Sequence, residues 1–250
     1  MERTKRCFFI LSLILLLISC AGGSKSEKKD KPVAIEEHFQ LAYNAAERGN
    51  LEEAVAEYQK VLKLDSKNAK AHLNLGIVYG RQEKWKKEIS QYKKAIQVDP
   101  DFAEAHFNLG VAYQGSGKFK EAVAQYQKTL QIYPSYVEAH TNLGVIYFRQ
   151  GLLDQALAEY QKAVEIKPEY AKGYYNLGSV YRQKKNTEEA ITFFQKALEI
   201  NPKYAAAHYA LAVIYYEKQE FQPAVEHFDQ AGKLGMAVDP KLLERLKAYR

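Results

Sequence analysis

Histidines recur at a fixed spacing along the chain, and such a column could in principle bind metal ions or transfer protons. Five of the six histidines share one register with a period of 34 residues: His38, His72, His106, His140 and His208. Zinc needs several ligands about 2.0–2.3 Å from a single ion. Equivalent side chains on stacked repeats point the same way and do not converge, and Tyr174 interrupts the column. We therefore predict half-buried packing residues and no metal site.

The sequence also contains no complete motif of the other catalytic or nucleotide-binding sites that we considered. Gly115–Lys118 looks like part of a phosphate-binding loop, but Ala112 stands where the motif requires a glycine and Phe119 follows the lysine. The loop is also expected between two helices, whereas the motif follows a strand. No serine-hydrolase, zinc-protease or paired-cysteine motif occurs in the sequence. We predict no enzymatic activity, no cofactor and no small-molecule substrate.

Many further positions recur with the same period of 34 residues. A leucine column comprises Leu41, Leu75, Leu109, Leu143, Leu177 and Leu211. The next position holds a small residue: Ala42, Gly76, Gly110, Gly144, Gly178 and Ala212. An aromatic column comprises Tyr58, Tyr92, Tyr126, Tyr160, Phe194 and Phe228, and prolines stand at Pro100, Pro134, Pro168 and Pro202. This pattern resembles the tetratricopeptide repeat (TPR) family, which has this period and this order of small, aromatic and proline positions.

The apolar spacing within one unit agrees with that resemblance. In residues 103–136, the second half carries an apolar stripe at helical spacing that begins at Phe119. Gly115 and Gly117 mark a turn before it, and Pro134 ends it. We expect Gly110 and Ala122 to be the small residues that let the two helices approach closely. Since a lone helix pair cannot cover its apolar faces, the units must stack into a solenoid.

The sequence thus predicts an all-α TPR solenoid of six helix-turn-helix repeats with a C-terminal capping helix. The repeats are 35–68, 69–102, 103–136, 137–170, 171–204 and 205–238, and the capping helix is 239–250. Glu88 departs from the pattern because it occupies a position that is otherwise alanine, so we expect looser packing there or a side chain bent outward. His227 lies outside the histidine column, and we expect it at the surface.

The N-terminus reads as a targeting signal. A basic start precedes an apolar run of 11 residues, 8–18, that only Ser12 interrupts. A membrane-spanning helix needs about 20 such residues, so the run fits a secretory signal better. The run ends in Leu17-Ile18-Ser19-Cys20, which resembles the lipobox of bacterial lipoprotein signal peptides.

The lipoprotein resemblance implies cleavage after residues 1–19 and acylation of Cys20, by palmitate among other chains. Residues 20–34 are small and charged, and we expect them to form a flexible tether. Ala21 follows the cysteine, and in Gram-negative members of that family the absence of Asp there implies the outer membrane, facing the periplasm. The resemblance therefore predicts a lipid-anchored protein of the bacterial cell envelope.

The net charge of +6 does not indicate a nucleic-acid partner. Residues 1–34 contribute +4, which leaves only +2 for the repeats and the cap. Phosphate binding requires a basic face or stripe on the folded part. We predict no nucleic-acid binding.

In the TPR family, the first helices line a concave groove, and positions 2, 5, 6, 9, 12 and 13 of each repeat face it. Position 6 holds four asparagines in a row: Asn74, Asn108, Asn142 and Asn176. They resemble the asparagine ladder of the TPR superhelix in O-GlcNAc transferase, which holds peptide backbone. Helices about 8–10 Å apart would match every third residue of an extended peptide that rises about 3.3 Å per residue.

Flanking positions would supply the specificity of such a groove. Candidate contacts are Phe107, Tyr175, Phe148, Arg81, Arg149 and Arg182, residue types that dominate binding energies at interfaces. Apolar residues such as Val111 at position 9 suggest an apolar floor and do not fit a carboxylate clamp. The alternative interpretation is that asparagine is a common filler at position 6 of TPRs.

The sequence is compatible with three functions. The leading hypothesis is a membrane-anchored scaffold that binds an extended segment of a partner protein in its groove. An assembly factor for a type IV pilus or secretion machine, as in pilotin lipoproteins, is the second. A regulatory subunit of an envelope enzyme is the third. The sequence does not name the partner.

Overall fold

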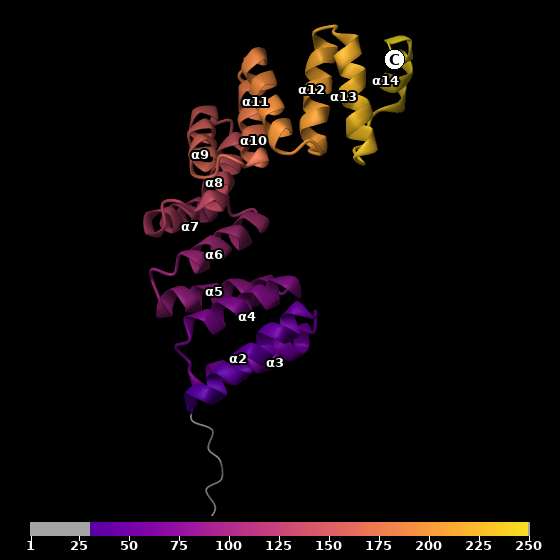
Figure 1. Cartoon of the computed structure of the whole chain (residues 1–250). Helices are drawn as coiled ribbons and strands as arrows, with labels where there is room; N and C mark the ends of the chain where they lie inside the picture. The colour runs from indigo at the N-terminus through magenta and orange to yellow at the C-terminus, as the bar shows by residue number, and fades with distance from the viewer. Residues whose placement is uncertain (1–30, 250) are drawn as a thin grey trace, which may run out of the picture.

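The computed structural model describes residues 31–249, which form an open stack of paired helices (Figure 1). The first helices of the six pairs are α2 (Lys31–Glu47), α4 (Ala69–Arg81), α6 (Ala103–Gly115), α8 (Val137–Arg149), α10 (Ala171–Gln183) and α12 (Ala205–Glu217). Their partners are α3 (Leu51–Leu64), α5 (Trp85–Val98), α7 (Phe119–Ile132), α9 (Leu153–Ile166), α11 (Thr187–Ile200) and α13 (Phe221–Lys233). Residues 31–249 contain no strand. The predicted all-helical solenoid is confirmed.

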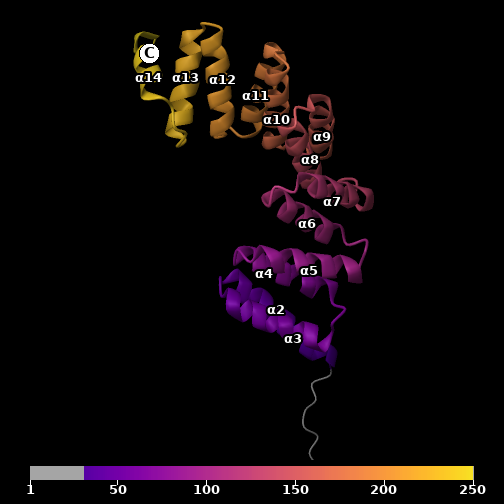
Figure 2. The same ribbon diagram turned by 180° about the vertical axis from the view of Figure 1, so that it is seen from behind.

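The stack bends along its length. Each second helix packs against its own first helix, and all but the last, α13, also pack against the first helix of the next repeat. Helices α6, α8 and α10 lie toward the inside of the bend, and α7, α9 and α11 lie toward the outside, in both views (Figures 1 and 2). The inside of the bend is therefore lined by first helices, as the family resemblance implies.

A glycine facing an aromatic ring joins the two helices of each central repeat. A Cβ atom added to Gly110 would lie 2.7 Å from Cε1 of Tyr126, which is closer than carbon atoms approach without overlap. The same contact joins Gly76 to Tyr92, Gly144 to Tyr160, and Gly178 to Phe194. Ala122 is fully buried, and the ring of Tyr126 is the group that a side chain at Gly110 would meet.

The turn between the two helices is the same in all six repeats. One residue of each turn has a positive φ of 59–82°: Gly49, Glu83, Gly117, Gly151, Lys185 and Gln219. The N–H of the following residue bonds to the carbonyl five residues earlier, for example Lys118 N to Tyr113 O at 2.9 Å. This is the Schellman arrangement that ends helices. The loop at Gly115–Lys118 is thus a helix-terminating turn.

The N-terminal end of the stack begins slightly before the predicted boundary. Helix α2 begins at Lys31, so the last four residues of the predicted tether, 31–34, are helical. Pro32 is compatible with this because a proline lacks only an N–H that the first helical turn leaves unbonded. The predicted signal segment and Cys20 lie outside the described residues.

The C-terminal segment covers the last repeat. Asp239 accepts a hydrogen bond from Lys241 N at 2.9 Å and begins α14 (Pro240–Arg245), which a short 3₁₀ helix, Lys247–Tyr249, follows. Leu246 is buried against the cluster that contains Phe228, and the ring of Tyr249 lies 4.6 Å from Phe221. These contacts agree with the predicted capping role.

Glu88 is buried, and the expected outward bend is wrong. Its carboxyl group occupies the space that a side chain at Gly80 would fill, at 2.8 Å from the Cβ position. Tyr92 donates a hydrogen bond of 3.4 Å to Oε1, while Oε2 has no partner within the described residues. Burial raises the pKa of Glu88, and the bond from Tyr92 only partly opposes this.

We predict that Glu88→Gln stabilises the protein at neutral pH by about 1 kcal/mol, since it removes a buried charge. The pKa of Glu88 is higher in the folded than in the unfolded chain, where it is near 4.5. The wild type should therefore lose stability as the pH rises from that value toward the folded pKa. Urea unfolding at several pH values measures the effect. Glu121→Gln, at an exposed site on α7, is the control and should change little; a less stable Glu88→Gln would contradict the account.

Candidate peptide-binding groove

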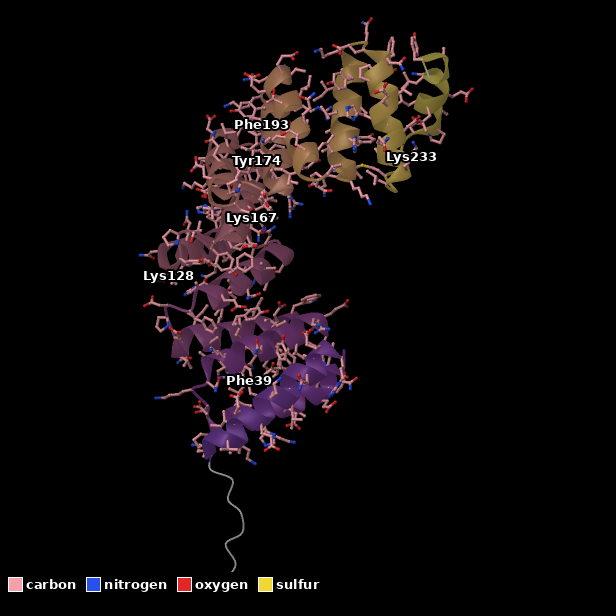
Figure 3. All side chains as sticks on the ribbon, in the orientation of Figure 1. Phe39, Lys128, Lys167, Tyr174, Phe193 and Lys233 are labelled. Atoms are coloured by element: carbon pink, nitrogen blue, oxygen red, sulfur yellow. The ribbon has the colours of Figure 1, made fainter. Side chains whose placement is uncertain are left out.

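The histidines of the column hold helices and loops together. Nδ1 of His72, His106 and His140 lies 2.6–2.7 Å from a side-chain oxygen 19 residues later on the second helix: Gln91, Gln125 and Glu159. The Nε2–H groups donate to the carbonyls of Ser66, Pro100 and Pro134 at 2.9–3.2 Å. At the one tyrosine of the column, Tyr174 stacks on Phe193 instead, with centroids 6.4 Å apart (Figure 3). Each column residue thus connects a first helix to its partner helix.

The carboxylate of Glu159, the partner of His140, also pairs with Lys162. Burial alone would raise the pKa of Glu159, but the hydrogen bond from His140 and the nearby Lys162 hold it below its ordinary value. The two ring nitrogens of His140 lie 2.6 Å from Oε2 of Glu159 and 2.9 Å from the carbonyl of Pro134. Residues 31–249 contain no group of three or more His, Cys, Asp or Glu side chains arranged to hold a metal ion.

His227 is not the isolated surface residue that the sequence suggested. Its Nδ1 lies 2.9 Å from Nδ1 of His208, and its ring stacks on Tyr215 with centroids 5.7 Å apart. Burial and the neighbouring His208 lower the pKa of His227. It is the helix partner of the last histidine in the column, 19 residues on, which the 34-residue alignment could have shown.

Three of the four asparagines of position 6 bond to the scaffold through their amide nitrogens. Asn142 Nδ2 donates to the hydroxyl of Tyr126 at 3.2 Å, and the Asn74 amide bonds to Tyr58 in the same way two repeats before. Asn108 Nδ2 donates to the carbonyl of Glu104 at 2.8 Å. The equivalent tyrosine, Tyr92, bonds to Glu88 instead.

Asn176 Nδ2 is buried and has no partner within the described residues. In the same part of the chain, Oδ1 of Asn108 and Oδ1 of Asn142 receive no hydrogen bond. The ladder therefore keeps acceptor oxygens available to another molecule.

Tyr58 and Tyr126, which accept the asparagine bonds, are buried tyrosines. Burial raises the pKa of both Tyr58 and Tyr126 to about 12, and the asparagine bonds oppose that shift. Both hydroxyls therefore stay protonated under ordinary conditions and can donate in turn. Tyr126 donates to Oε1 of Gln114 at 2.8 Å, which links two groove positions to one buried ring.

The groove carries two pockets. One, of about 430 Å³, is lined by Phe148, Tyr175, Ser179, Arg182, Gln183, Phe194 and Ala210 from α8, α10, α11 and α12. It brings together three of the predicted contact residues, Phe148, Tyr175 and Arg182. The other, of about 390 Å³, lies at α2 and is lined by Ile35, Glu36, Phe39, Gln40, Tyr43, Asn68 and Lys70. No predicted contact residue lines that second pocket.

The other predicted contact residues are partly engaged within the protein. Arg81 donates to the carbonyl of Ala46 at 2.7 Å, and Arg182 pairs with Glu217 at 3.1 Å. Arg149 is exposed and makes no ion pair within the described residues. These bonds attach each repeat to its neighbour, so Arg149 is the arginine most open to a ligand.

A second set of aromatic residues, which the sequence analysis overlooked, supports the predicted ones. The ring of Phe107 stacks on Tyr136 at 4.8 Å, and that of Tyr175 meets Tyr204 edge-on at 5.2 Å. Tyr136 and Tyr204 belong to a column at the last position of the repeat, with Phe102 and Tyr170. The 34-residue alignment contains this signal.

Sequence profiles of known families match most of the described chain. A profile described as TPR repeat matches residues 45–83, 81–117 and 115–151, and one described as tetratricopeptide repeat matches 135–203 and 169–232. The chain belongs to the tetratricopeptide repeat family. No curated protein sequence gives a significant match.

Solved TPR structures resemble this chain over most of its length. The MamA protein is 30% identical, with a TM-score of 0.61 over 69% of this chain and 94% of that one. YrrB, described as a TPR protein with an unusual peptide-binding site, is 28% identical, with a TM-score of 0.61 over 73% and 97%. PilF of Pseudomonas aeruginosa is 19% identical, with a TM-score of 0.74 over 89% and 100%, and shows the shared fold alone.

We predict that Tyr126→Phe destabilises this TPR protein by about 1 kcal/mol, because Gln114 and Asn142 both lose a hydrogen-bond partner. The matched control is Tyr160→Phe, one repeat later, whose hydroxyl makes no hydrogen bond within the described residues. That change should leave the free energy of unfolding nearly unaltered. Equal losses in the two variants, measured by urea unfolding, would show that the tyrosine–asparagine bond does not contribute.

Proposed function

We propose that the protein is a scaffold whose groove binds an extended segment of a partner protein. The observation that carries this proposal is the ladder: its amide nitrogens face the scaffold, and acceptor oxygens of Asn108 and Asn142 are left without partners. Peptide N–H groups are the natural donors to such acceptors, because every residue except proline carries one. A ligand in this groove would be recognised first by its backbone.

Side chains of the ligand would then be selected by the pocket around Arg182. Phe148, Tyr175 and Phe194 supply aromatic walls, and Ser179 and Gln183 supply polar groups at the edge. Such a mixture favours an apolar or aromatic side chain with a polar neighbour. The peptide-binding site of YrrB, a related TPR protein, supports the same class of ligand.

A ladder variant tests this role. We expect phage that display random peptides to be enriched on the wild-type protein, and the enriched peptide to lose at least about tenfold in affinity when Asn74, Asn108, Asn142 and Asn176 are all alanine, since several hydrogen bonds vanish. Fluorescence anisotropy measures the affinity, and circular dichroism checks that helicity is kept. The control replaces the exposed turn residues Asn50 and Asn186 by alanine and should bind normally. Unchanged binding by the ladder variant would refute the proposal.

We further propose that Cys20 anchors this scaffold to a bacterial envelope membrane, and that the outer membrane is its location in a Gram-negative cell. The lipobox-like residues 17–20 support this. Among the residues that the structure describes, no helix is long and apolar enough to cross a membrane.

The anchor can be tested with two cysteine variants. Cys20→Ser should abolish labelling with radioactive palmitate and release the protein from the membrane fraction. Cys7→Ser should change neither, because Cys7 precedes the proposed cleavage site. A Cys20→Ser protein that remains labelled and membrane-bound would contradict the proposed anchor.

The two alternative roles, pilus or secretion assembly factor and regulatory subunit of an envelope enzyme, use the same groove with different partners. The likeness to PilF supports the fold of the first and no more, since identity is 19%. Crosslinking in the native membrane, followed by mass spectrometry of proteins captured by wild type but not by the ladder variant, identifies the partner.

A further inference from the structure

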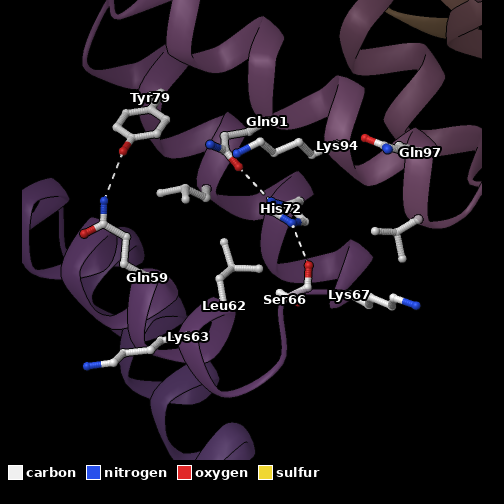
Figure 4. Close-up of a pocket in the computed structure, with 12 residues that line it drawn as sticks. Gln59, Leu62, Lys63, Ser66, Lys67, His72, Tyr79, Gln91, Lys94 and Gln97 are labelled. Carbon is white, nitrogen blue, oxygen red and sulfur yellow. Dashed lines mark hydrogen bonds between the residues drawn. The ribbon is translucent and has the colours of Figure 1, made fainter.

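A concavity outside the groove lies between the second helices α3 and α5 (Figure 4). Its volume is about 730 Å³. Leu62 and Leu75 form part of an apolar floor, and three lysines, Lys63, Lys67 and Lys94, line the sides with several glutamines. None of the 12 lining residues carries a carboxylate. We refer to this site as the lysine pocket.

The walls of the pocket are fixed by hydrogen bonds. Gln59 Nε2 donates to the hydroxyl of Tyr79 at 3.4 Å and joins α3 to α4 on one side. The buried His72 bonds to Gln91 on α5 at 2.7 Å and to the carbonyl of Ser66 at 3.2 Å (Figure 4). The lysines therefore surround a preformed depression, and the binding of a ligand requires no rearrangement of the helices.

Lys94 differs from its equivalents in other repeats. Lysine occupies the same register at Lys60, Lys128, Lys162 and Lys196, and each of those pairs with a carboxylate: Glu57, Asp101, Glu159 and Glu199. Around Lys94, the corresponding places hold Gln91 and Gln97, and Lys94 has no ion pair within residues 31–249. The sequence thus leaves the charge of this one lysine uncompensated.

The other two lysines add to that charge. Neither Lys63 nor Lys67 forms an ion pair within the described part of the chain. The nearest acidic residue in sequence, Asp65, accepts the backbone N–H of Lys67 at 3.1 Å and shapes the loop. By contrast, the pocket at His140 is lined by Glu165, and the one at His208 by Glu226 and Asp229. Only the lysine pocket, among these three outward pockets, has a purely basic lining.

We propose that the lysine pocket binds an acidic segment of a partner protein, at a site independent of the groove. Three lysines offer charge to carboxylates, the glutamine amides offer both donors and acceptors to a peptide backbone, and the leucine floor accepts an apolar side chain. Nucleic acid fits this site less well, because phosphate binding needs a longer basic track. The adjoining α3 instead begins with Glu52 and Glu53.

The test uses the full chain in detergent and a short fluorescein-labelled oligoglutamate as the probe, followed by fluorescence anisotropy. Replacement of Lys63, Lys67 and Lys94 by glutamine should weaken binding by about tenfold, the effect of three modest ion pairs. The matched control replaces Lys60, Lys128 and Lys162, which removes the same charge from already paired lysines, and should weaken binding by less than about twofold.

The proposal would be overturned by no binding of oligoglutamate to the wild type, by no loss in the pocket variant, by an equal loss in both variants, or by tighter binding of a short DNA duplex than of oligoglutamate. The asparagine-ladder variant should retain oligoglutamate binding, and its loss there would place the probe in the groove. If the groove proposal fails, the expected binding of oligoglutamate to the lysine pocket is unaffected, because the two sites share no residue.

Discussion

The contact between a glycine of the first helix and an aromatic ring of the second determines the geometry on which the groove depends. Because Gly76, Gly110, Gly144 and Gly178 have no side chain, a buried Tyr or Phe ring lies directly against the helix backbone. Any Cβ atom there would force the ring, and with it the second helix, to move. At Tyr126, the same ring carries the hydroxyl that holds a ladder asparagine, Asn142, in the next repeat. Helix packing and the positioning of a ladder amide are thus two uses of one side chain.

The two faces of the solenoid are built from different positions of the same repeat, which lets them vary independently. The inside of the bend carries amides, aromatics and arginines on first helices, and the outside carries lysines and carboxylates on second helices. Outside, four of the five lysines in the register of Lys94 pair with carboxylates, so glutamine in place of glutamate around Lys94 leaves this one position of the register without an ion pair in the described residues. In the core, Glu88 is a comparable departure, because it accepts a hydrogen bond from the hydroxyl of Tyr92. Asn108 therefore donates to the carbonyl of Glu104 in its own helix and not to that tyrosine. Local substitutions in a regular array thus produce the features that a partner can distinguish.

The fold was predictable from sequence because every repeat imposes the same constraint at the same spacing, and six copies make coincidence untenable. Helix pairs, the capping segment and the structural nature of the histidines followed from that spacing. What a column of residues contacts did not follow: the partner of Gly110 is an aromatic ring, Arg81 bonds to a backbone carbonyl, and Glu88 is buried because Gly80 makes room for it. Non-glycine residues with positive φ, such as Glu83, were likewise invisible without the structure. These are pairwise, three-dimensional facts, and a one-dimensional pattern fixes only which positions are equivalent.

We propose above all that the acceptor oxygens of the ladder contact the backbone of a bound segment. Side-chain amide resonances of asparagine report this directly, in a nuclear magnetic resonance titration with a peptide selected on the wild-type protein. The account predicts that the resonances of Asn74, Asn108, Asn142 and Asn176 shift together and saturate at one stoichiometry, while those of the turn residues Asn50 and Asn186 stay in place. Saturable binding that leaves all four ladder resonances unmoved would show that the asparagines only fill space, and that the groove is not where the partner binds.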